Sequence, residues 1–310
     1  MRRKLLLAAV VAVVVVIVVL IGGLWFATNQ LLFPSWKGAT RDLAVRKPEI
    51  AKSWGEGCGN LRLTHQFTFS EVNIPSVNGY QLPGWLIKTA ENGEGPARGA
   101  IMLIPAGGSD RREETRYVKF LLSQHLDVLT LDLGCQDEAP CPVPGISNGD
   151  RESRDVFSTY LYLVAKYDKV YAMGSSVGAA SILIALPEMP KLGGVIAENP
   201  MTSFQRLIRD APQSKSSPGW ATNVLIKLVM LRGRFDGLLS SEHSLPLTST
   251  TPVYFIHSKQ DKIVSYQQTQ ELATLYAGPK TVWFPDKGSH AEVWDADHEE
   301  YETRLAGFLR

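Results

Sequence analysis

The chain has little cysteine, little histidine and almost no net charge. Its 310 residues include three cysteines and six histidines, and 32 basic against 31 acidic side chains leave a formal net charge of +1. The cysteine spacing fits no zinc pattern and no histidines cluster with the cysteines, which excludes the common zinc sites. The balanced charge argues against nucleic acid or a strongly acidic partner. Beyond the N-terminal segment, the sequence shows no internal repeat and no low-complexity tract.

Charged residues are also missing from residues 5–27, which are rich in valine and leucine. About 20 apolar residues are enough for a helix to cross a membrane, and Trp25 and Phe26 close the run, as aromatic residues do at the interface. We therefore predict a transmembrane anchor over residues 1–28. A cleaved signal peptide is the alternative, although its apolar core is usually shorter, roughly 7–15 residues.

The basic residues before this run predict its orientation. Arg2, Arg3 and Lys4 favour the cytoplasm, so the rest of the chain is expected in the periplasm or outside the cell, anchored or, after cleavage, secreted. Cys135 and Cys141 flank a short loop, and a disulfide between them would suit an oxidising compartment. Two free thiols are the alternative, and Cys58 would be left over in either case.

The remaining chain is predicted to fold as one α/β domain over residues 61–310, after an irregular connector over residues 29–60. Short apolar runs alternate with helical patterns, which is typical of a doubly wound, mostly parallel sheet. Strands are predicted at 65–74, 80–88, 99–104, 128–133, 169–173, 194–197, 252–256 and 281–284, and helices at 113–125, 151–166, 179–186, 220–234 and 291–309. The first two strands are joined by Asn78-Gly79, a hairpin signal that adds an antiparallel edge.

One motif predicts chemistry. Gly174-Ser175-Ser176-Val177-Gly178 reads G-x-S-x-G and stands between a predicted strand and a predicted helix. A serine on such a turn is raised above the sheet, and the N-terminus of the helix behind it favours an oxyanion. An ordinary strand-to-helix turn with small residues is the alternative, so the interpretation depends on partners for Ser176.

Partners are expected in the loops that follow the later strands, because functional loops gather at the carboxyl ends of parallel strands. Asp261 follows the strand at 252–256, and His290 follows the strand at 281–284. The order Ser176, Asp261, His290 is the one expected for this turn. Asp286 and Glu198 are alternative acids. His257 is expected to make a structural hydrogen bond, and His298, on a charged helix, is expected to be solvated.

From about residue 65 to its C-terminus the chain resembles the α/β-hydrolases. Within that superfamily it most resembles the Bem46-like and ABHD12/13-like membrane-anchored serine hydrolases. The residues that carry the resemblance are Gly174-x-Ser176-x-Gly178, Glu198-Asn199-Pro200, His257-x-x-x-Asp261-x-x-Val264 and Gly288-x-His290. The resemblance implies that Ser176 is the nucleophile, Asp261 the orienting acid and His290 the general base, without a metal or organic cofactor.

The chain departs from that family in two loops. The oxyanion hole is expected to use the backbone N–H groups of Val177 and Gly107, with Ala106 as the alternative to Gly107, but Pro105-Ala106 stands where the family usually has His-Gly. After Asp132, a loop with cysteine, proline and acidic residues replaces the family's arginine loop. If Cys135 and Cys141 pair, this loop is expected to shape one wall of the site, and the alternative is that it only stabilises an exported fold.

Residues 201–251 lie where such folds carry a lid. The helix predicted at 220–234 has a broad apolar face. Such a face suits a lid over an acyl chain or a surface that dips into the membrane, and plain packing on the sheet is the alternative. Together these features predict a membrane-anchored serine hydrolase, and the resemblance implies that it acts on a small-molecule or lipid-like ester or thioester. The alternatives are an acyltransferase with the same three residues and a non-catalytic scaffold at the membrane.

Overall fold

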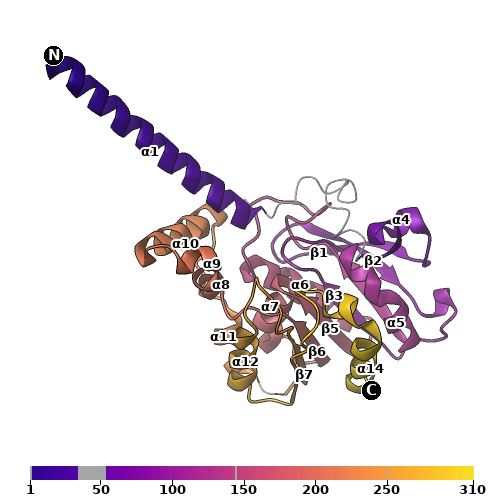
Figure 1. Ribbon diagram of the computed structural model, residues 1–310. Helices are drawn as coiled ribbons and strands as arrows, with labels where there is room; N and C mark the ends of the chain where they lie inside the picture. Colours follow the sequence, from indigo (N-terminus) through magenta and orange to yellow (C-terminus); the bar gives the residue numbers. More distant parts are fainter. Residues whose placement is uncertain (1, 34–53, 144, 249) are drawn as a thin grey trace.

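An eight-stranded sheet forms the centre of the computed structural model, which describes residues 2–33, 54–143, 145–248 and 250–310 (Figure 1). The strands are β1 (Ser70–Pro75), β2 (Gln81–Ile87), β3 (Gly99–Ile104), β4 (Leu126–Leu131), β5 (Val170–Ser175), β6 (Leu192–Glu198), β7 (Val253–Ile256) and β8 (Lys280–Trp283). Their order is β1-β2-β4-β3-β5-β6-β7-β8. β2 runs antiparallel to β1 and β4, and the other neighbours are parallel, which confirms the predicted fold class.

Helices cover both faces of this sheet. The helices are α1 (Arg2–Leu32), α4 (Leu61–Thr64), α5 (Val118–Ser123), α6 (Asp150–Val164), α7 (Val177–Ala185), α8 (Phe204–Asp210), α9 (Pro212–Lys215), α10 (Gly219–Gly233), α11 (Ser241–Ser244), α12 (Tyr266–Leu275), α13 (Val293–Ala296) and α14 (His298–Phe308). Alternate side chains of β3 enter the two cores: Met102 belongs to the cluster that contains side chains of α6, α7 and α12, whereas Leu103 belongs to the one that contains side chains of α5 and α14. This two-residue period is what a strand buried on both faces requires.

Some predicted boundaries were wrong, for local backbone reasons. β1 begins at Ser70 rather than at residue 65, because α4 extends to Thr64 and its C-cap, His65, has a φ of 52° in the left-handed region. The helix predicted at 291–309 is divided into α13 and α14, and Asp297 caps the second by accepting a hydrogen bond from the N–H of Glu300. The helix predicted at 113–125 begins as a 3₁₀ turn over Glu113–Tyr117. The pattern of α12 was not recognised in the sequence.

The segment between β6 and β7, predicted as a lid, contains α8 to α11. α10 packs against α8 and against the C-terminal end of α1 rather than within either sheet core (Figure 1). Its buried side chains form a separate cluster that contains no strand residue: Leu32, Phe204, Ile208, Ile226, Val229 and Phe235. α1 extends beyond the predicted anchor, and residues 34–53, most of the predicted connector, lie outside the described residues. Within the described part of the chain, Ala9–Leu32 alone is long and apolar enough to cross a membrane.

Candidate active site

Ser176 occupies a strained turn between β5 and α7. Its φ of 52° and ψ of −114° are unusual for a residue with a side chain, and such strain costs about 1–3 kcal/mol. The Ser176 N–H donates to the carbonyl of Glu198 over 2.8 Å, which ties the turn to β6. A Cβ at position 178 would overlap the carbonyl oxygen of Ile104, so the glycine there lets the turn approach β3. The fully buried Ser175 lies in the sheet, whereas Ser176 is partly exposed.

The structure brings the three predicted side chains together. His290, in the loop after β8, has its Nε2 atom 2.9 Å from Ser176 Oγ. The other ring nitrogen, Nδ1, lies 2.7 Å from Oδ2 of Asp261, which follows β7. The Asp261 side chain is fully buried, and the His290 side chain is 14% exposed. With the proton on Nδ1, the ring can donate to Asp261 and accept from the Ser176 hydroxyl.

Four further donors hold the Asp261 carboxylate. Oδ1 accepts from the backbone N–H groups of Ile263 and Val264 at 2.8 and 3.0 Å. Oδ2 lies 2.6 Å from Asn199 Nδ2 and 3.0 Å from His257 Nε2. Burial disfavours the charged carboxylate, but the hydrogen bonds from His257 and His290 outweigh it and hold the pKa of Asp261 well below its ordinary value. The carboxylate is therefore ionised throughout the neutral range.

Asn199 and His257 thus help to position Asp261. Asn199 directly follows β6, and its φ of 50° lies in the left-handed region that asparagine tolerates better than most residues. His257 is fully buried at the end of β7, and its Nδ1 lies 2.6 Å from Thr269 Oγ1. The sequence offered the Glu-Asn-Pro motif as a signal for Asn199, but its contact with Asp261 was not foreseen.

The other candidate acids and histidines lie elsewhere. Asp286 has a largely exposed side chain and pairs with Lys259 at 3.0 Å. Glu198 is buried and accepts a hydrogen bond from the Tyr301 hydroxyl over 2.7 Å. His298 is exposed on α14. Among the described residues, no group of histidine, cysteine and acidic side chains is arranged to hold a metal ion.

Gly107 and Val177, the predicted oxyanion donors, are neighbours. A Cβ at position 107 would lie 2.5 Å from Val177 Cγ2. The carbonyl of Ala106 accepts hydrogen bonds from Ser109 N–H at 3.0 Å and from Gln136 Nε2 at 2.8 Å. The C=O and N–H of a trans peptide point in opposite directions. Since the Ala106–Gly107 bond is trans, holding the Ala106 carbonyl also fixes the direction of the Gly107 N–H.

Gln136 belongs to a loop closed by a disulfide between Cys135 and Cys141. The Gln136 side chain is 3% exposed and bridges two loops, because its Oε1 accepts from Leu133 N–H at 2.9 Å while its Nε2 reaches Ala106. The sequence pattern predicts that this loop shapes one wall of the site but gives no signal for Gln136.

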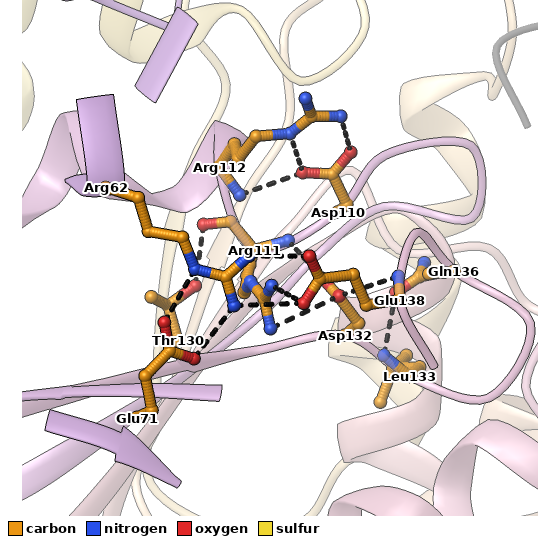
Figure 2. A network of polar contacts seen from close by, with 10 residues as sticks. All are labelled: Arg62, Glu71, Asp110, Arg111, Arg112, Thr130, Asp132, Leu133, Gln136 and Glu138. Carbon is orange, nitrogen blue, oxygen red and sulfur yellow. Dashed lines mark hydrogen bonds and ion pairs between the residues drawn. The ribbon is translucent and has the colours of Figure 1, made fainter. Parts of the chain in front are cut away.

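An ion-pair network also holds this loop, through Glu138 (Figure 2). Glu138 accepts hydrogen bonds from Arg62 Nη1 at 2.6 Å and from Arg111 Nη2 at 2.5 Å. The hydrogen bond from Arg62 is the main cause that lowers the pKa of Glu138 to about 2. Arg111 also donates its backbone N–H to Asp132 Oδ1 over 2.9 Å, and its guanidinium lies 4.6 Å from the ring centre of Trp85. Arg111, from the loop after β3, thus contacts Asp132. The loop that follows Asp132 itself lacks the arginine that the family usually has there.

The similarities of this chain to known sequences are distant. No family model matches the chain. An uncharacterized protein, YfhR of Escherichia coli O157:H7, is 23% identical over 257 residues, which cover 77% of this chain and 79% of that protein.

Solved structures also resemble this chain, at low sequence identity. The esterase Pf2001 of Pyrococcus furiosus is 19% identical with a TM-score of 0.60, over 78% of this chain and 92% of that one. The α/β hydrolase GrgF from Penicillium sp. sh18 is 14% identical with a TM-score of 0.61, over 78% of this chain and 98% of that one. Together with the sheet order, these likenesses show that the chain has the α/β-hydrolase fold.

Proposed function

We propose that the protein is a membrane-anchored serine hydrolase of the Bem46-like and ABHD12/13-like type, which cleaves carboxylic esters or thioesters through an acyl-enzyme. The observation that carries the proposal is the hydrogen-bonded line from Asp261 through His290 to Ser176, with steps of 2.7 and 2.9 Å. Further support comes from the name of a structural neighbour, Pf2001, which is an esterase.

In the proposed reaction, Ser176 Oγ attacks the acyl carbonyl carbon while His290 Nε2 takes the hydroxyl proton. The protonated ring then gives this proton to the leaving alcohol or thiol as its bond to the acyl carbon breaks. Water attacks the resulting acyl-serine by the same route, which releases the acid and restores Ser176. Asp261 keeps the proton of His290 on Nδ1 and stabilises the charged ring. The steps use only side chains, backbone amides and water.

The negative charge that develops on the carbonyl oxygen is assigned to the N–H groups of Val177 and Gly107. Fixed donors of this kind are worth most when they are already oriented before the reaction, and loss of one typically costs about 10²–10³ in rate. The hydrogen bonds to the Ala106 carbonyl provide that orientation for Gly107. Acyl transfer to an alcohol would use the same groups with a different acceptor in place of water.

The proposed location is a single-pass anchor with the catalytic domain on the periplasmic or extracellular side. Ala9–Leu32 has the length and composition of a membrane-spanning helix. The disulfide between Cys135 and Cys141 is of the kind that persists in oxidising compartments. Arg3 and Lys4 precede the apolar run, as is usual on the cytoplasmic side.

A fluorophosphonate probe tests the central claim. We expect the wild-type protein to be labelled and Ser176→Ala to remain unlabelled while it keeps the wild-type melting temperature. A series of p-nitrophenyl esters of increasing acyl length would then define the acyl preference. A folded wild-type protein that neither reacts with the probe nor cleaves any ester of the series would instead support the scaffold alternative.

A further inference from the structure

The end of α1 is built into the folded domain. Leu32 is fully buried in the cluster that α8 and α10 share. Its carbonyl accepts a hydrogen bond from the N–H of Ile146 over 2.9 Å. Ile146 in turn lies against the loop that carries Gly107, because a Cβ at position 107 would be 3.0 Å from Ile146 Cδ1. Ile146 therefore links the last turn of α1 to the loop that carries Gly107.

α10 is fixed to α1 at the level where the apolar run ends. The Arg232 guanidinium lies 3.6 Å from the ring centre of Trp25, and its Nη1 donates to the Trp25 carbonyl over 3.2 Å and also contacts Thr28 Oγ1. A mostly apolar cavity of about 240 Å³ lies between the helices and is lined by Ile21, Leu24, Trp25, Thr28, Leu228 and Arg232. At 1.5 Å per residue, Trp25 is about 10 Å along the helix from Leu32.

One side of α10 presents apolar side chains that the described structure leaves uncovered. Trp220 is 71% exposed, Val224 40% and Leu231 74%, at a spacing that keeps them on one side of the helix. Lys227 is exposed between them. Residues 212–234 contain four basic side chains and no acidic one. Exposed apolar side chains of this kind can enter the interfacial layer of a bilayer, and basic side chains are attracted to anionic phospholipid.

We infer that α10 rests on the same bilayer that α1 enters, with Trp220, Val224 and Leu231 in its interfacial layer. The inference depends on α1 spanning the membrane, as in the proposed function. Trp25 marks the membrane interface along α1, and Arg232 holds α10 at that level, so a phospholipid surface is the partner nearest to the exposed face. This contact would hold the Gly107 loop beside the lipid, where amphiphilic esters are concentrated.

The depth of single labels tests the contact without any need for catalysis. In the full chain with Cys58→Ser, a cysteine placed by Trp220→Cys or Leu231→Cys would carry a polarity-sensitive fluorophore in nanodiscs of phosphatidylcholine and phosphatidylglycerol. Leu275→Cys is the matched control, because Leu275 is an exposed leucine of α12, a helix that lies away from α1 (Figure 1). We expect the labels at 220 and 231, unlike that at 275, to emit at shorter wavelength, to be quenched by spin-labelled lipid and to be protected from iodide.

Two outcomes would overturn the inference. Labels at 220 and 231 that behave as the label at 275 would show that α10 stays in water. Protection from iodide without quenching by spin-labelled lipid would mean that protein, such as a second copy of the chain, covers the face. If a labelled variant fails to fold, the intrinsic tryptophan fluorescence of unlabelled protein replaces the labels. Brominated lipid should then quench the wild type more than Trp220→Phe. Equal quenching of the two proteins would also overturn the inference. Failure of the esterase assay alone would leave these results interpretable.

Discussion

The side-chain amide of Asn199 donates over 2.6 Å to Asp261 Oδ2, the same oxygen that lies 2.7 Å from His290 Nδ1. His257 Nε2 also lies 3.0 Å from this oxygen. The direction of the carboxylate is thereby set from β6 and β7 together, before any substrate arrives. Because its amide is neutral, Asn199 can orient Asp261 without adding a second charge that would compete with the imidazolium of the proposed mechanism for this carboxylate.

We predict that Asn199→Ala lowers kcat more than it changes KM. A hydrogen bond to a charged group contributes about 1.5–3 kcal/mol, which corresponds to a rate loss of roughly 10- to 150-fold. Steady-state kinetics on a soluble p-nitrophenyl ester measure both constants. Asn92→Ala is the control, because it also removes a half-buried asparagine, whose side chain hydrogen-bonds to Thr68 and Lys88 rather than to the site residues. A melting temperature that falls while kcat is retained would assign Asn199 a purely structural role.

Gln136→Ala should weaken the proposed oxyanion hole. Without the 2.8 Å hydrogen bond from Nε2, the Ala106 carbonyl loses one of its two donors, and the Gly107 N–H becomes less well oriented. Loss of a neutral hydrogen bond of about 0.5–1.5 kcal/mol predicts a fall in kcat of roughly 2- to 13-fold. A boronic acid, which forms a tetrahedral adduct with the serine, should lose affinity by a similar factor.

The matched control for this change is Gln270→Ala, because Gln270 is exposed on α12 and should leave both readouts unchanged. Gln136→Glu is a second comparison, since a carboxylate oxygen would face the Ala106 carbonyl without a proton to donate. If Gln136→Ala lowers kcat but leaves boronic acid affinity at the wild-type value, Gln136 does not act through the oxyanion hole.

Gly107→Ala should damage the site by crowding. Its Cβ would lie 2.5 Å from Val177 Cγ2 and 3.0 Å from Ile146 Cδ1, and overpacking of this kind typically costs about 1–3 kcal/mol. We expect slower fluorophosphonate labelling and a lower melting temperature. Adding Val177→Ala removes the nearest methyl groups while keeping the backbone N–H, so the double variant should recover part of the labelling rate. No recovery would mean that Gly107 matters for a reason other than the space beside Val177.

The sequence predicts the meeting of Ser176, Asp261 and His290 because each lies in the turn or loop that follows a parallel strand of the sheet. Strand order and chain order then restrict which loops can meet. Gln136 and Asn199 were harder to predict because their contacts depend on loop backbones, including the left-handed φ of Asn199. The sequence pattern also predicted the wrong first residue for β1. The left-handed residue His65 caps α4, and β1 begins later in the chain. The position of α10 was equally open, because an apolar face does not say whether it packs on a sheet or on another helix.

Glu114 predicts a measurable pH dependence of stability. Its side chain is fully buried, and neither carboxylate oxygen has a hydrogen-bond partner within the described structure. Burial, followed by repulsion from Glu113, raises the pKa of Glu114 well above its ordinary value. The folded protein therefore keeps a proton that the unfolded chain releases as pH rises above the ordinary carboxyl pKa. Stability must then fall with rising pH across the interval up to the raised pKa.

Glu114→Gln should remove this contribution, because an amide does not titrate. We expect the variant to lose less stability than the wild type between pH 5 and pH 8, as measured by urea unfolding at fixed ionic strength. Some of the fall should remain, because burial also raises the pKa of Glu198. The exposed Glu188→Gln is the control and should keep the wild-type slope. A slope in Glu114→Gln equal to that of the wild type would show that Glu114 is not the buried group that holds the proton.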